Sequence, residues 1–342
     1  MARIALDVMG GDHAPVAPVT GALLALRESG GAHTIQLVGR EAVVRSELER
    51  QLAGEFADLR AAAAAAFEVV HADDVIEMTD KPSVAIRGKS KSSMAVGLKL
   101  QAAGQSDAFV SAGNTGAQMA ASAYILGLHA GLDRPAISTL MPTARQSVVV
   151  LDAGANVDCS AEELLQFARI GAVYAEDILG RPRPSVGLLS IGEEPEKGNK
   201  VVKEAHQLLA ASGLNFHGNI EGRDIPAGAS DRGPFDVVVC DGFVGNVVLK
   251  LYEGIAPMMV GLLMKSGVSK EQLAGALSHL DYASVGGAPL LGVKGASIIC
   301  HGKSSPKAIK NALAIAVKTV ESRMSDHVGQ RLAQHGAASA QS

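Results

Sequence analysis

Short runs of β-branched and apolar residues alternate along this chain with longer segments of helical periodicity, and this alternation restricts the fold more than any other feature. A strand that is buried on both faces reads as a continuous apolar run, as residues 237–240 do. Such strands alternating with helices are typical of a mostly parallel sheet that helices cover on both faces. The sequence therefore predicts an α/β fold with a three-layer α/β/α arrangement.

The individual elements follow from the same periodicity. The predicted strands are residues 4–8, 34–38, 67–71, 108–111, 147–152, 186–191, 215–220, 236–240 and 296–300. The predicted helices are residues 15–28, 41–53, 93–103, 116–126, 161–179, 200–211, 246–265 and 306–323. Ser160 and Glu163 have the spacing of a capping box for the fifth helix, and Gly180 is placed to end it.

The length and the order of these elements favour one domain over residues 1–328, although 342 residues could also form two lobes. The alanine run 61–66 is interpreted as helix or loop. Residues 329–342 are rich in Ala, Ser, Gln and Gly, and we expect a disordered tail there.

Composition excludes several classes of function. The net charge is −4, aromatic residues make up 3% and there is no Trp, so neither electrostatic attraction to nucleic acid nor base stacking is expected. Three cysteines lack zinc-binding spacing, and two of them, Cys240 and Cys300, end apolar runs as buried reduced thiols would. The N-terminus does not resemble a signal peptide, and no uninterrupted apolar run reaches about 18 residues. We expect a cytoplasmic protein without a transmembrane helix.

Six predicted strands end in glycine and a short polar residue just before a helix. The carboxyl ends of parallel strands share one edge of a sheet, so these loops can converge on one crevice. The six loops span residues 9–13, 111–116, 152–156, 191–194, 241–246 and 301–304.

The loop 111–116, with the sequence Ser-Ala-Gly-Asn-Thr-Gly, has the chemistry that an anion requires. Gly113 and Gly116 allow close approach of backbone amides, while Ser111, Asn114 and Thr115 add side-chain donors at a helix N-terminus. The alternative is an ordinary strand-to-helix turn with Asn114 or Thr115 as the N-cap.

Two further polar segments leave their role open. Asp12 and His13 follow a Gly-Gly turn and could act in a site or cap the next helix. Residues 87–94 contain three cations and three hydroxyls, among them Lys91, Ser92 and Ser93, and fit a phosphate clamp, a docking patch for an acidic partner or a solvated loop.

Two strand-end residues later in the chain are also candidates. Asp241 could orient a substrate or receive a proton, or could cap the helix predicted from Asn246. His301 follows the end of an apolar strand. It could act directly in a site, or its hydrogen bond could only position a neighbouring residue.

Taken together, these motifs resemble the bacterial phosphate acyltransferase (PlsX) family over residues 4–321. The resemblance is carried by the order and spacing of segments 7–12, 111–116, 152–156, 187–194, 241–246, 286–292 and 301–302. It implies kinship with phosphotransacetylases and with the isocitrate and isopropylmalate dehydrogenase fold, a Rossmann-like fold with a mixed sheet containing some antiparallel strands.

The resemblance also implies a reaction in which inorganic phosphate attacks the thioester of a long-chain acyl carrier protein and forms acyl phosphate for phospholipid synthesis. Phosphate is itself a nucleophile and thiolate leaves readily, so we expect neither a metal nor a cofactor. We expect phosphate at Ser111, Gly113, Asn114, Thr115 and Gly116, near Lys91, Ser92 and Ser93. Asn246 and the amides after Gly242 or Gly245 could face the oxyanion. Asp12, His13, Asp241 and His301 are candidates for orienting phosphate or protonating the leaving sulfur.

Residues 249–264 are apolar nearly all round and contain Pro257. Within a helical segment at about 246–285, they favour a dimer contact, with a protruding tip at the membrane surface as the alternative. A membrane contact would suit handover of a long-chain product to a membrane glycerol-3-phosphate acyltransferase. Two other functions remain open: a phosphotransacetylase that acts on short-chain acyl-CoA, and a non-catalytic membrane-associated scaffold for lipid synthesis.

Overall fold

The computed structural model describes residues 1–82, 87–269, 272 and 286–339. The chain forms two compact units, and each is described by itself. Unit 1 comprises Met1–Ala130 and Ala283–Ser342, and unit 2 comprises Gly131–Tyr282. The middle of the chain also builds a second sheet, β6-β7-β12-β8-β9.

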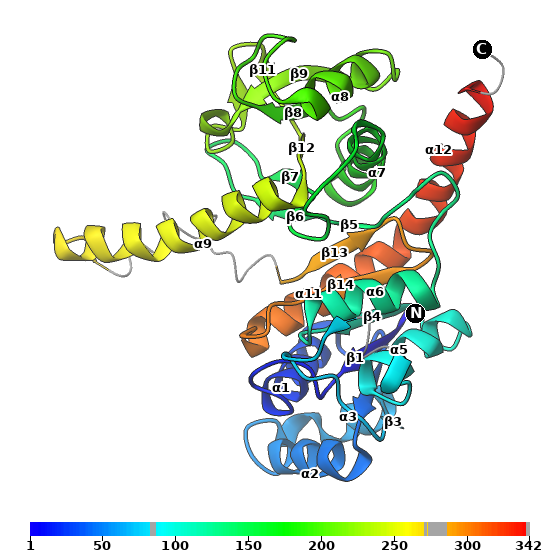
Figure 1. Ribbon diagram of the computed structural model, residues 1–342. Helices are drawn as coiled ribbons and strands as arrows, with labels where there is room; N and C mark the ends of the chain where they lie inside the picture. The colour runs from blue at the N-terminus through cyan, green and yellow to red at the C-terminus, as the bar shows by residue number, and fades with distance from the viewer. Residues whose placement is uncertain (83–86, 270–271, 273–285, 340–342) are drawn as a thin grey trace. The chain divides into compact units, whose positions relative to one another are not determined.

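Unit 1 contains a sheet with the strand order β3-β2-β1-β4-β14-β13. All neighbouring pairs among these strands are parallel except β13 with β14, which is antiparallel. The strands are β1 (Arg3–Asp7), β2 (Thr34–Gly39), β3 (Phe67–His71), β4 (Ala108–Ser111), β13 (Ala288–Leu291) and β14 (Ala296–Ile299). Figure 1 shows the orange C-terminal strands β13 and β14, and β14 pairs with β4, which in turn pairs with the blue N-terminal strand β1, so segments from both ends of the chain form one sheet.

Helices cover both faces of this sheet, as the alternation predicts. The helices are α1 (Val16–Ser29), α2 (Glu41–Leu52), α3 (Arg60–Ala66), α5 (Ser93–Ala102), α6 (Thr115–Ile125), α11 (Pro306–Glu321) and α12 (Met324–Ser339). In β1, Ile4 and Leu6 join the core formed with α1 and α11, whereas Ala5 joins the core formed with α5 and α6. This alternation of side chains places the two cores on opposite faces of one sheet.

The structure shows the conformation of the alanine run and of the C-terminal segment in unit 1. The alanine run lies within the helix α3, where Ala63 and Ala66 are buried. Helix α12 runs to Ser339, into the segment for which we expected a disordered tail. Apolar residues Val328 and Leu332 of this helix are buried, which explains why the helix continues beyond residue 328.

Unit 2 contains a second sheet with the order β6-β7-β12-β8-β9, in which only β6 is antiparallel to its neighbour. Its elements are β5 (Ala136–Ile137), β6 (Thr139–Met141), β7 (Val148–Leu151), α7 (Ala161–Leu179), β8 (Val186–Ser190), α8 (Lys200–Ala210), β9 (Phe216–Glu221), β10 (Ala229–Ser230), β11 (Gly233–Pro234), β12 (Val237–Val239) and α9 (Gly242–Lys265). Helix α7 begins with the predicted capping box of Ser160 and Glu163 and ends at Gly180, which has a φ of 67°.

Helix α9 extends away from the sheet of unit 2 (Figure 1, yellow). It begins at Gly242, four residues before the predicted start, because Asp241 caps it. It also contains Pro257, as the predicted helix does. Residues 273–285, the end of the predicted 246–285 segment, lie outside the described residues.

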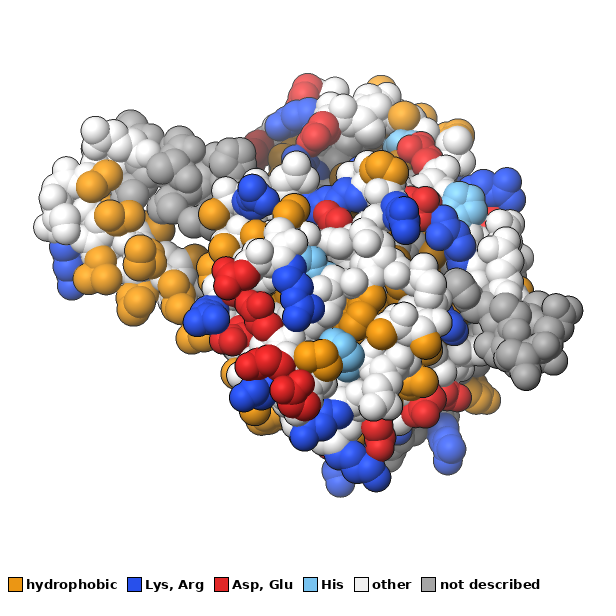
Figure 2. All heavy atoms as spheres, turned by 90° about the horizontal axis from the view of Figure 1, so that it is seen from above, with side chains coloured by type: hydrophobic (Ala, Val, Ile, Leu, Met, Phe, Trp, Pro, Cys, Tyr) orange, Lys and Arg blue, Asp and Glu red, His pale blue; other side chains and the backbone are white. Residues whose placement is uncertain are grey.

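The side chains of α9 are largely exposed. Only Gly242, Gly245 and Leu249 are buried, and Figure 2 shows hydrophobic side chains gathered along the extended part of the helix. Among the described residues, this is the one helix long and apolar enough to cross a membrane by length and composition alone, which is weak evidence for a membrane span. The apolar part of α9 includes the charged residues Lys250 and Glu253, so it is not an uninterrupted apolar run in the sequence.

Candidate active site

Three of the six glycine-containing loops meet at one edge of the unit 1 sheet. They follow β1, β4 and β14, which are adjacent and parallel, so their carboxyl ends lie side by side. Strands β2 and β3 lie on the other side of β1, which makes the space between β1 and β4 the point where the strand order reverses. Ligands of open α/β sheets bind at such points.

A buried carboxylate, Asp7, lies at the centre of this edge. Ser111 Oγ donates a hydrogen bond to Asp7 Oδ2 at 2.7 Å and accepts one from the amide of Gly113 at 2.9 Å. The amide of Met9 donates to Asp7 Oδ1 at 3.0 Å, and Ser93 also donates to this carboxylate. Burial raises the pKa of Asp7 above its ordinary value, and these donors oppose the shift. We call Asp7, Ser93, Ser111 and Gly113 the first cluster.

Close backbone packing supports the first cluster. A Cβ on Gly10 would lie 2.7 Å from Asp7 Oδ2 and 2.8 Å from the amide nitrogen of Gly113. Glycine is therefore required there to bring the loop after β1 against the loop after β4.

Asn114 is the N-cap of α6, one of the two roles that the sequence left open. Its Oδ1 accepts a hydrogen bond from the amide of Ala117 at 3.0 Å. Its Nδ2 donates to the carbonyl oxygens of Met78 and Asp80 at 3.0 and 3.1 Å. The Asn114 side chain therefore ties the 77–80 turn to the start of α6, and its groups are occupied by the protein itself.

The remaining members of the 111–116 loop differ in exposure. Thr115, the first residue of α6, is exposed, whereas Ser111 and Gly113 are buried. Gly116 is half-buried, and a Cβ there would lie 2.9 Å from Pro82 Cγ. The side-chain donor of this loop that faces outward is therefore the hydroxyl of Thr115.

The structure separates the three candidates of segment 87–94. Ser93 belongs to the first cluster through Asp7. Ser92 is buried and caps α5 by accepting a hydrogen bond from the amide of Ala95 at 3.3 Å. Lys91 is exposed, and its Nζ lies 3.2 Å from Asp73 Oδ2, so it forms a surface ion pair.

Asp12 and His13 are both exposed and do not cap the next helix. The N-cap of α1 is Pro15, and no side chain forms a capping hydrogen bond there. The amide of Asp12 donates to the carbonyl oxygen of Gly302 at 2.7 Å, which holds the loop after β1 beside the loop after β14.

His301 is exposed at the start of the loop after β14. Its Nδ1 accepts a hydrogen bond from the amide of Lys303 at 3.2 Å. This contact assigns the ring proton of a neutral His301 to Nε2, so Nε2 of the neutral ring can donate a hydrogen bond.

A second buried carboxylate, Asp152, organises the carboxyl end of the unit 2 sheet. Its Oδ1 accepts hydrogen bonds from the amides of Ile137, Gly154 and Ala155 at 3.0–3.2 Å. Its Oδ2 accepts from the backbone amide and the side chain of Asn156 at 2.6 and 2.9 Å. Burial raises the pKa of Asp152, and the hydrogen bonds from Ala155, Asn156 and Ile137 oppose the shift. We call Asp152, Asn156, Gly242 and Gly245 the second cluster.

The two glycines of the second cluster pack directly against its polar groups. A Cβ on Gly242 would lie 2.7 Å from Asp152 Oδ2, and one on Gly245 would collide with the carbonyl oxygen of Asp152. Strands β7 and β12 are parallel neighbours, so the loop 152–156 and the start of α9 are adjacent as the sequence predicts.

Asp241 caps α9, again one of the two roles left open. Its Oδ1 accepts a hydrogen bond from the amide of Val244 at 2.8 Å. The amides of Gly242 and Gly245 donate to the carbonyl oxygens of Asn156 and Asp241. These amides are therefore already paired.

Asn246 is exposed beside the second cluster. A Cβ on Gly154 would lie 3.5 Å from the Asn246 side chain, which places that side chain over the 152–156 loop.

Sequence reasoning did not select Asp7, Asp152 or Asn156 as site residues, although all three lie in the segments that it quoted. The signal was an acidic residue at the end of an apolar strand, directly before a glycine-containing turn. Such a carboxylate can accept several amides of the turn, and burying it without partners would be costly.

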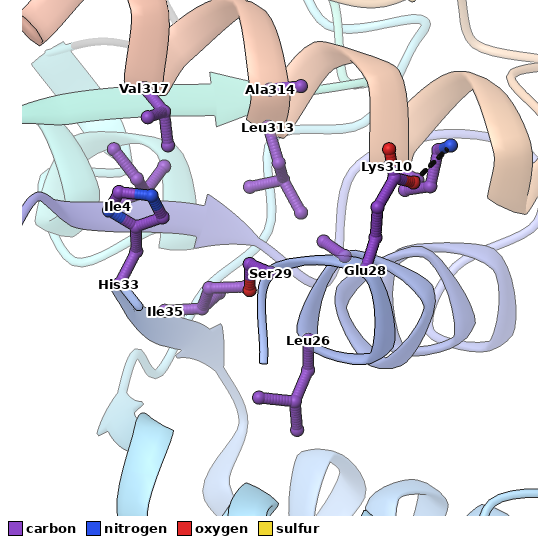
Figure 3. Close-up of a pocket in the computed structure, with 11 residues that line it drawn as sticks. Ile4, Leu26, Glu28, Ser29, His33, Ile35, Lys310, Leu313, Ala314 and Val317 are labelled. Atoms are coloured by element: carbon purple, nitrogen blue, oxygen red, sulfur yellow. Dashed lines mark hydrogen bonds and ion pairs between the residues drawn. The ribbon is translucent and has the colours of Figure 1, made fainter. Parts of the chain in front are cut away.

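Other features of the described residues do not add to these clusters. No group of three His, Cys, Asp or Glu side chains among them is arranged to hold a metal ion. A cavity of about 190 Å³ lies between α1 and α11 near the amino ends of β1 and β2, with an ion pair of 2.6 Å between Lys310 and Glu28 (Figure 3). It is at the opposite end of the strands from the first cluster.

Comparisons with solved structures place this architecture among the phosphotransacetylases. A phosphotransacetylase from Streptococcus pyogenes matches with a TM-score of 0.64 at 18% identity, covering 94% of each chain. A branched-chain phosphotransacylase from Enterococcus faecalis V583 matches with a TM-score of 0.60 at 14% identity, covering 94% of this chain and 99% of that one. These likenesses show that the chain has a phosphotransacetylase-like α/β fold with mixed parallel and antiparallel sheets.

Sequence comparison identifies the family. The model of the family described as "Fatty acid synthesis protein" matches residues 2–327. The proteins named "Phosphate acyltransferase" from Desulforamulus reducens and Pelotomaculum thermopropionicum are 49% and 48% identical, covering 94% and 95% of this chain and 94% of each relative. The chain belongs to this phosphate acyltransferase family and is an acyltransferase.

Proposed function

We propose that this acyltransferase moves a long-chain acyl group from acyl carrier protein to inorganic phosphate, for phospholipid synthesis. The full-length similarity to phosphate acyltransferases carries this proposal. A phosphate oxygen attacks the thioester carbonyl carbon and the carbon–sulfur bond breaks. The products are acyl phosphate and the thiolate of the carrier protein, which takes up a proton.

The first cluster and the start of α6 form the proposed phosphate site. Because Ser111 and Asn114 are engaged with Asp7 and the 77–80 turn, they shape the loop instead of contacting phosphate. Direct contacts are assigned to the Thr115 hydroxyl and to backbone amides of the loop between Gly113 and Gly116. Ser92, which caps α5, and Lys91, paired with Asp73, support the neighbouring segment.

This division of roles predicts different kinetic effects. Thr115→Ala should raise the phosphate KM while leaving stability near that of the wild type. Asn114→Ala should lower stability through loss of the cap. If both variants kept the wild-type phosphate KM, the assignment of this loop to phosphate would be wrong.

Exposed polar residues near the two clusters are proposed for the acyl side of the reaction and for proton transfer. Asn246 is assigned to the carbonyl oxygen that becomes negative in the transition state. His301 is assigned to protonation of the leaving sulfur: its imidazolium form gives up a proton and becomes the neutral ring whose Nδ1 accepts from the amide of Lys303. Asp12 and His13 are assigned to orienting phosphate, and Asp241 to holding the start of α9 in place.

The activity can be tested with purified chain, palmitoyl carrier protein and labelled phosphate. We expect acyl phosphate to form only when all three are present. Faster phosphate-dependent loss of acetyl-CoA than of palmitoyl carrier protein would support a short-chain phosphotransacetylase instead. Membrane binding without acyl phosphate from either substrate would support a scaffold role.

The exposed apolar side chains of α9 support the proposal of a homodimer contact. They include Leu251, Ile255, Met258, Met259, Leu262 and Met264, all more than two-fifths exposed. An exposed apolar surface of this kind is typical of a protein or membrane contact. Sedimentation at several concentrations should show a dimer for the wild type and a monomer for Leu251→Glu with Ile255→Glu.

A second role of the same helix is transient contact with the cytoplasmic membrane surface, for handover of the product to a glycerol-3-phosphate acyltransferase. We therefore propose a cytoplasmic, peripherally membrane-associated enzyme. Liposome flotation should recover the wild type with lipid more completely than Leu262→Glu with Leu263→Glu, and equal recovery would refute this contact.

We also propose that the fold belongs to the wider isocitrate and isopropylmalate dehydrogenase class. The two mixed α/β sheets, each with an antiparallel strand pair, support this assignment. An experimental structure compared with that class would test it.

A further inference from the structure

A large cavity lies in unit 2, next to the second cluster but not part of it. Its volume is about 860 Å³, and it lies between the end of β8, the start of α8, the start of α9 and the loop 157–159. Its walls therefore come from four segments of one unit, so it is defined within unit 2.

The lining of this cavity is mostly apolar and carries little charge. Of the described residues that line it, none is lysine or arginine, two are acidic (Asp158 and Asp241), and apolar residues form most of the wall. Its two thiols are uncharged at neutral pH, because burial raises the pKa of Cys159 to about 12 and that of Cys240 well above its ordinary value. A phosphate or nucleotide would find no counter-charge here, whereas a hydrocarbon chain would be well solvated.

Three large apolar side chains of the lining remain exposed. Ile191 is 81% exposed, Val157 63% and Phe243 60%. These three side chains come from different segments and gather at one cavity, which is typical of a site for an apolar ligand.

A buried hydroxyl adds one polar feature to the cavity. Ser190 is a lining residue, and its Oγ is buried without a hydrogen-bond partner among the described residues. A Cβ on Gly198 would lie 3.1 Å from this oxygen, so the glycine leaves space next to it. A ligand carbonyl that reached Ser190 would supply the missing acceptor.

The cavity is continuous with the second cluster through the loop after β12. Cys240 and Asp241 line the cavity, and the next residue, Gly242, packs against Asp152. A chain held in the cavity would therefore have one end at the second cluster and Asn246.

We propose that this cavity, which we call the acyl groove, binds the hydrocarbon chain of the acyl substrate and sets the preference for chain length. This inference rests on the proposed acyl transfer. The amide-rich pantetheine arm of the carrier protein is a poorer fit, because most of the wall is apolar.

An aromatic side chain introduced into the acyl groove should shorten the acyl chain that the groove can hold. Val201 lies on α8, lines the acyl groove and is half-buried. We expect Val201→Phe to lower kcat/KM for palmitoyl carrier protein about tenfold, which corresponds to the loss of about two methylene contacts. For octanoyl carrier protein, kcat/KM should fall less than about twofold. Val201→Ala should shift the preference in the opposite direction, and the phosphate KM should stay unchanged in both variants.

Lys203→Phe provides the matched control, because Lys203 lies on α8, is exposed and does not line the acyl groove. Thermal unfolding of all variants identifies any that fail to fold. An equal palmitoyl-to-octanoyl ratio in Val201→Phe and Lys203→Phe would overturn the proposal. So would an equal loss on both chain lengths, which would instead place the pantetheine arm in the cavity.

Direct binding separates failure of this inference from failure of the proposed reaction. A fluorescent long-chain fatty acid should bind the wild type and Lys203→Phe, and bind Val201→Phe about tenfold more weakly. If the wild type formed no acyl phosphate but still bound the probe in this pattern, the acyl groove would stand and the reaction would be wrong. Equal binding to all three proteins would refute the acyl groove.

Discussion

Replacement of Asp152 by Asn tests the role of the buried carboxylate in the second cluster. Asparagine has almost the same shape, but its amide nitrogen cannot accept hydrogen bonds. With that nitrogen in the Oδ2 position, both donors of Asn156, at 2.6 and 2.9 Å, lose their acceptor. The opposite orientation leaves the three backbone donors at Oδ1 without one.

The smaller loss, two buried donors, sets the expected effect. Each unsatisfied buried donor costs about 1–3 kcal/mol, so Asp152→Asn should lower the free energy of unfolding by about 2–6 kcal/mol. Urea unfolding followed by circular dichroism measures this difference, provided that the transition is two-state.

Asp231→Asn is the matched control, because Asp231 is exposed in a turn of the same unit, and it should change stability by less than about 0.5 kcal/mol. A loss below about 1 kcal/mol for Asp152→Asn would refute the reasoning. It would mean that Asp152 is protonated in the native protein and that its five contacts do not stabilise a carboxylate.

Three further predictions follow from the packing of the described residues. Gly245→Ala should destabilise the chain by about 1–3 kcal/mol, because its Cβ would collide with a carbonyl oxygen, whereas Gly254→Ala in the same helix has open space and should be neutral or stabilising in thermal unfolding. Asn114→Ala should cost about 1–2 kcal/mol in urea unfolding, and an unchanged midpoint would contradict its role as a cap. Burial raises the pKa of Cys300 to about 12, so a thiol reagent at pH 8 should label it only after denaturation; rapid labelling of the native chain, detected by peptide mass, would contradict this burial.

Much of the fold was predictable because its elements are locally encoded. The helix α7 illustrates this: its capping box, its apolar periodicity and its terminal glycine all lie within the segment itself. Short strands were not predictable in the same way. The antiparallel strands β6 and β13 span only three and four residues, so their pairing with β7 and β14 depends on neighbours supplied by the rest of the chain.

The location of the candidate site could be predicted from the sequence, but the roles of most of its side chains could not. The loops after β1, β4 and β14 meet because parallel strands end at one edge, and that follows from the order of elements. Whether Asn114 faces a ligand or the protein does not follow from its loop. Its carbonyl partners, Met78 and Asp80, lie 36 and 34 residues earlier in the sequence.

The sequence by itself determined an α/β acyltransferase of recognisable family, with glycines and short polar residues where its strands end, because these properties are written in local composition and order. The tertiary structure alone decided which polar groups are already satisfied. Ser111 and Asp7 are 104 residues apart, and their hydrogen bond exists only because β1 and β4 are neighbours. It also decided that the middle of the chain forms a second sheet with its own buried carboxylate, since burial and pairing depend on contacts between distant segments.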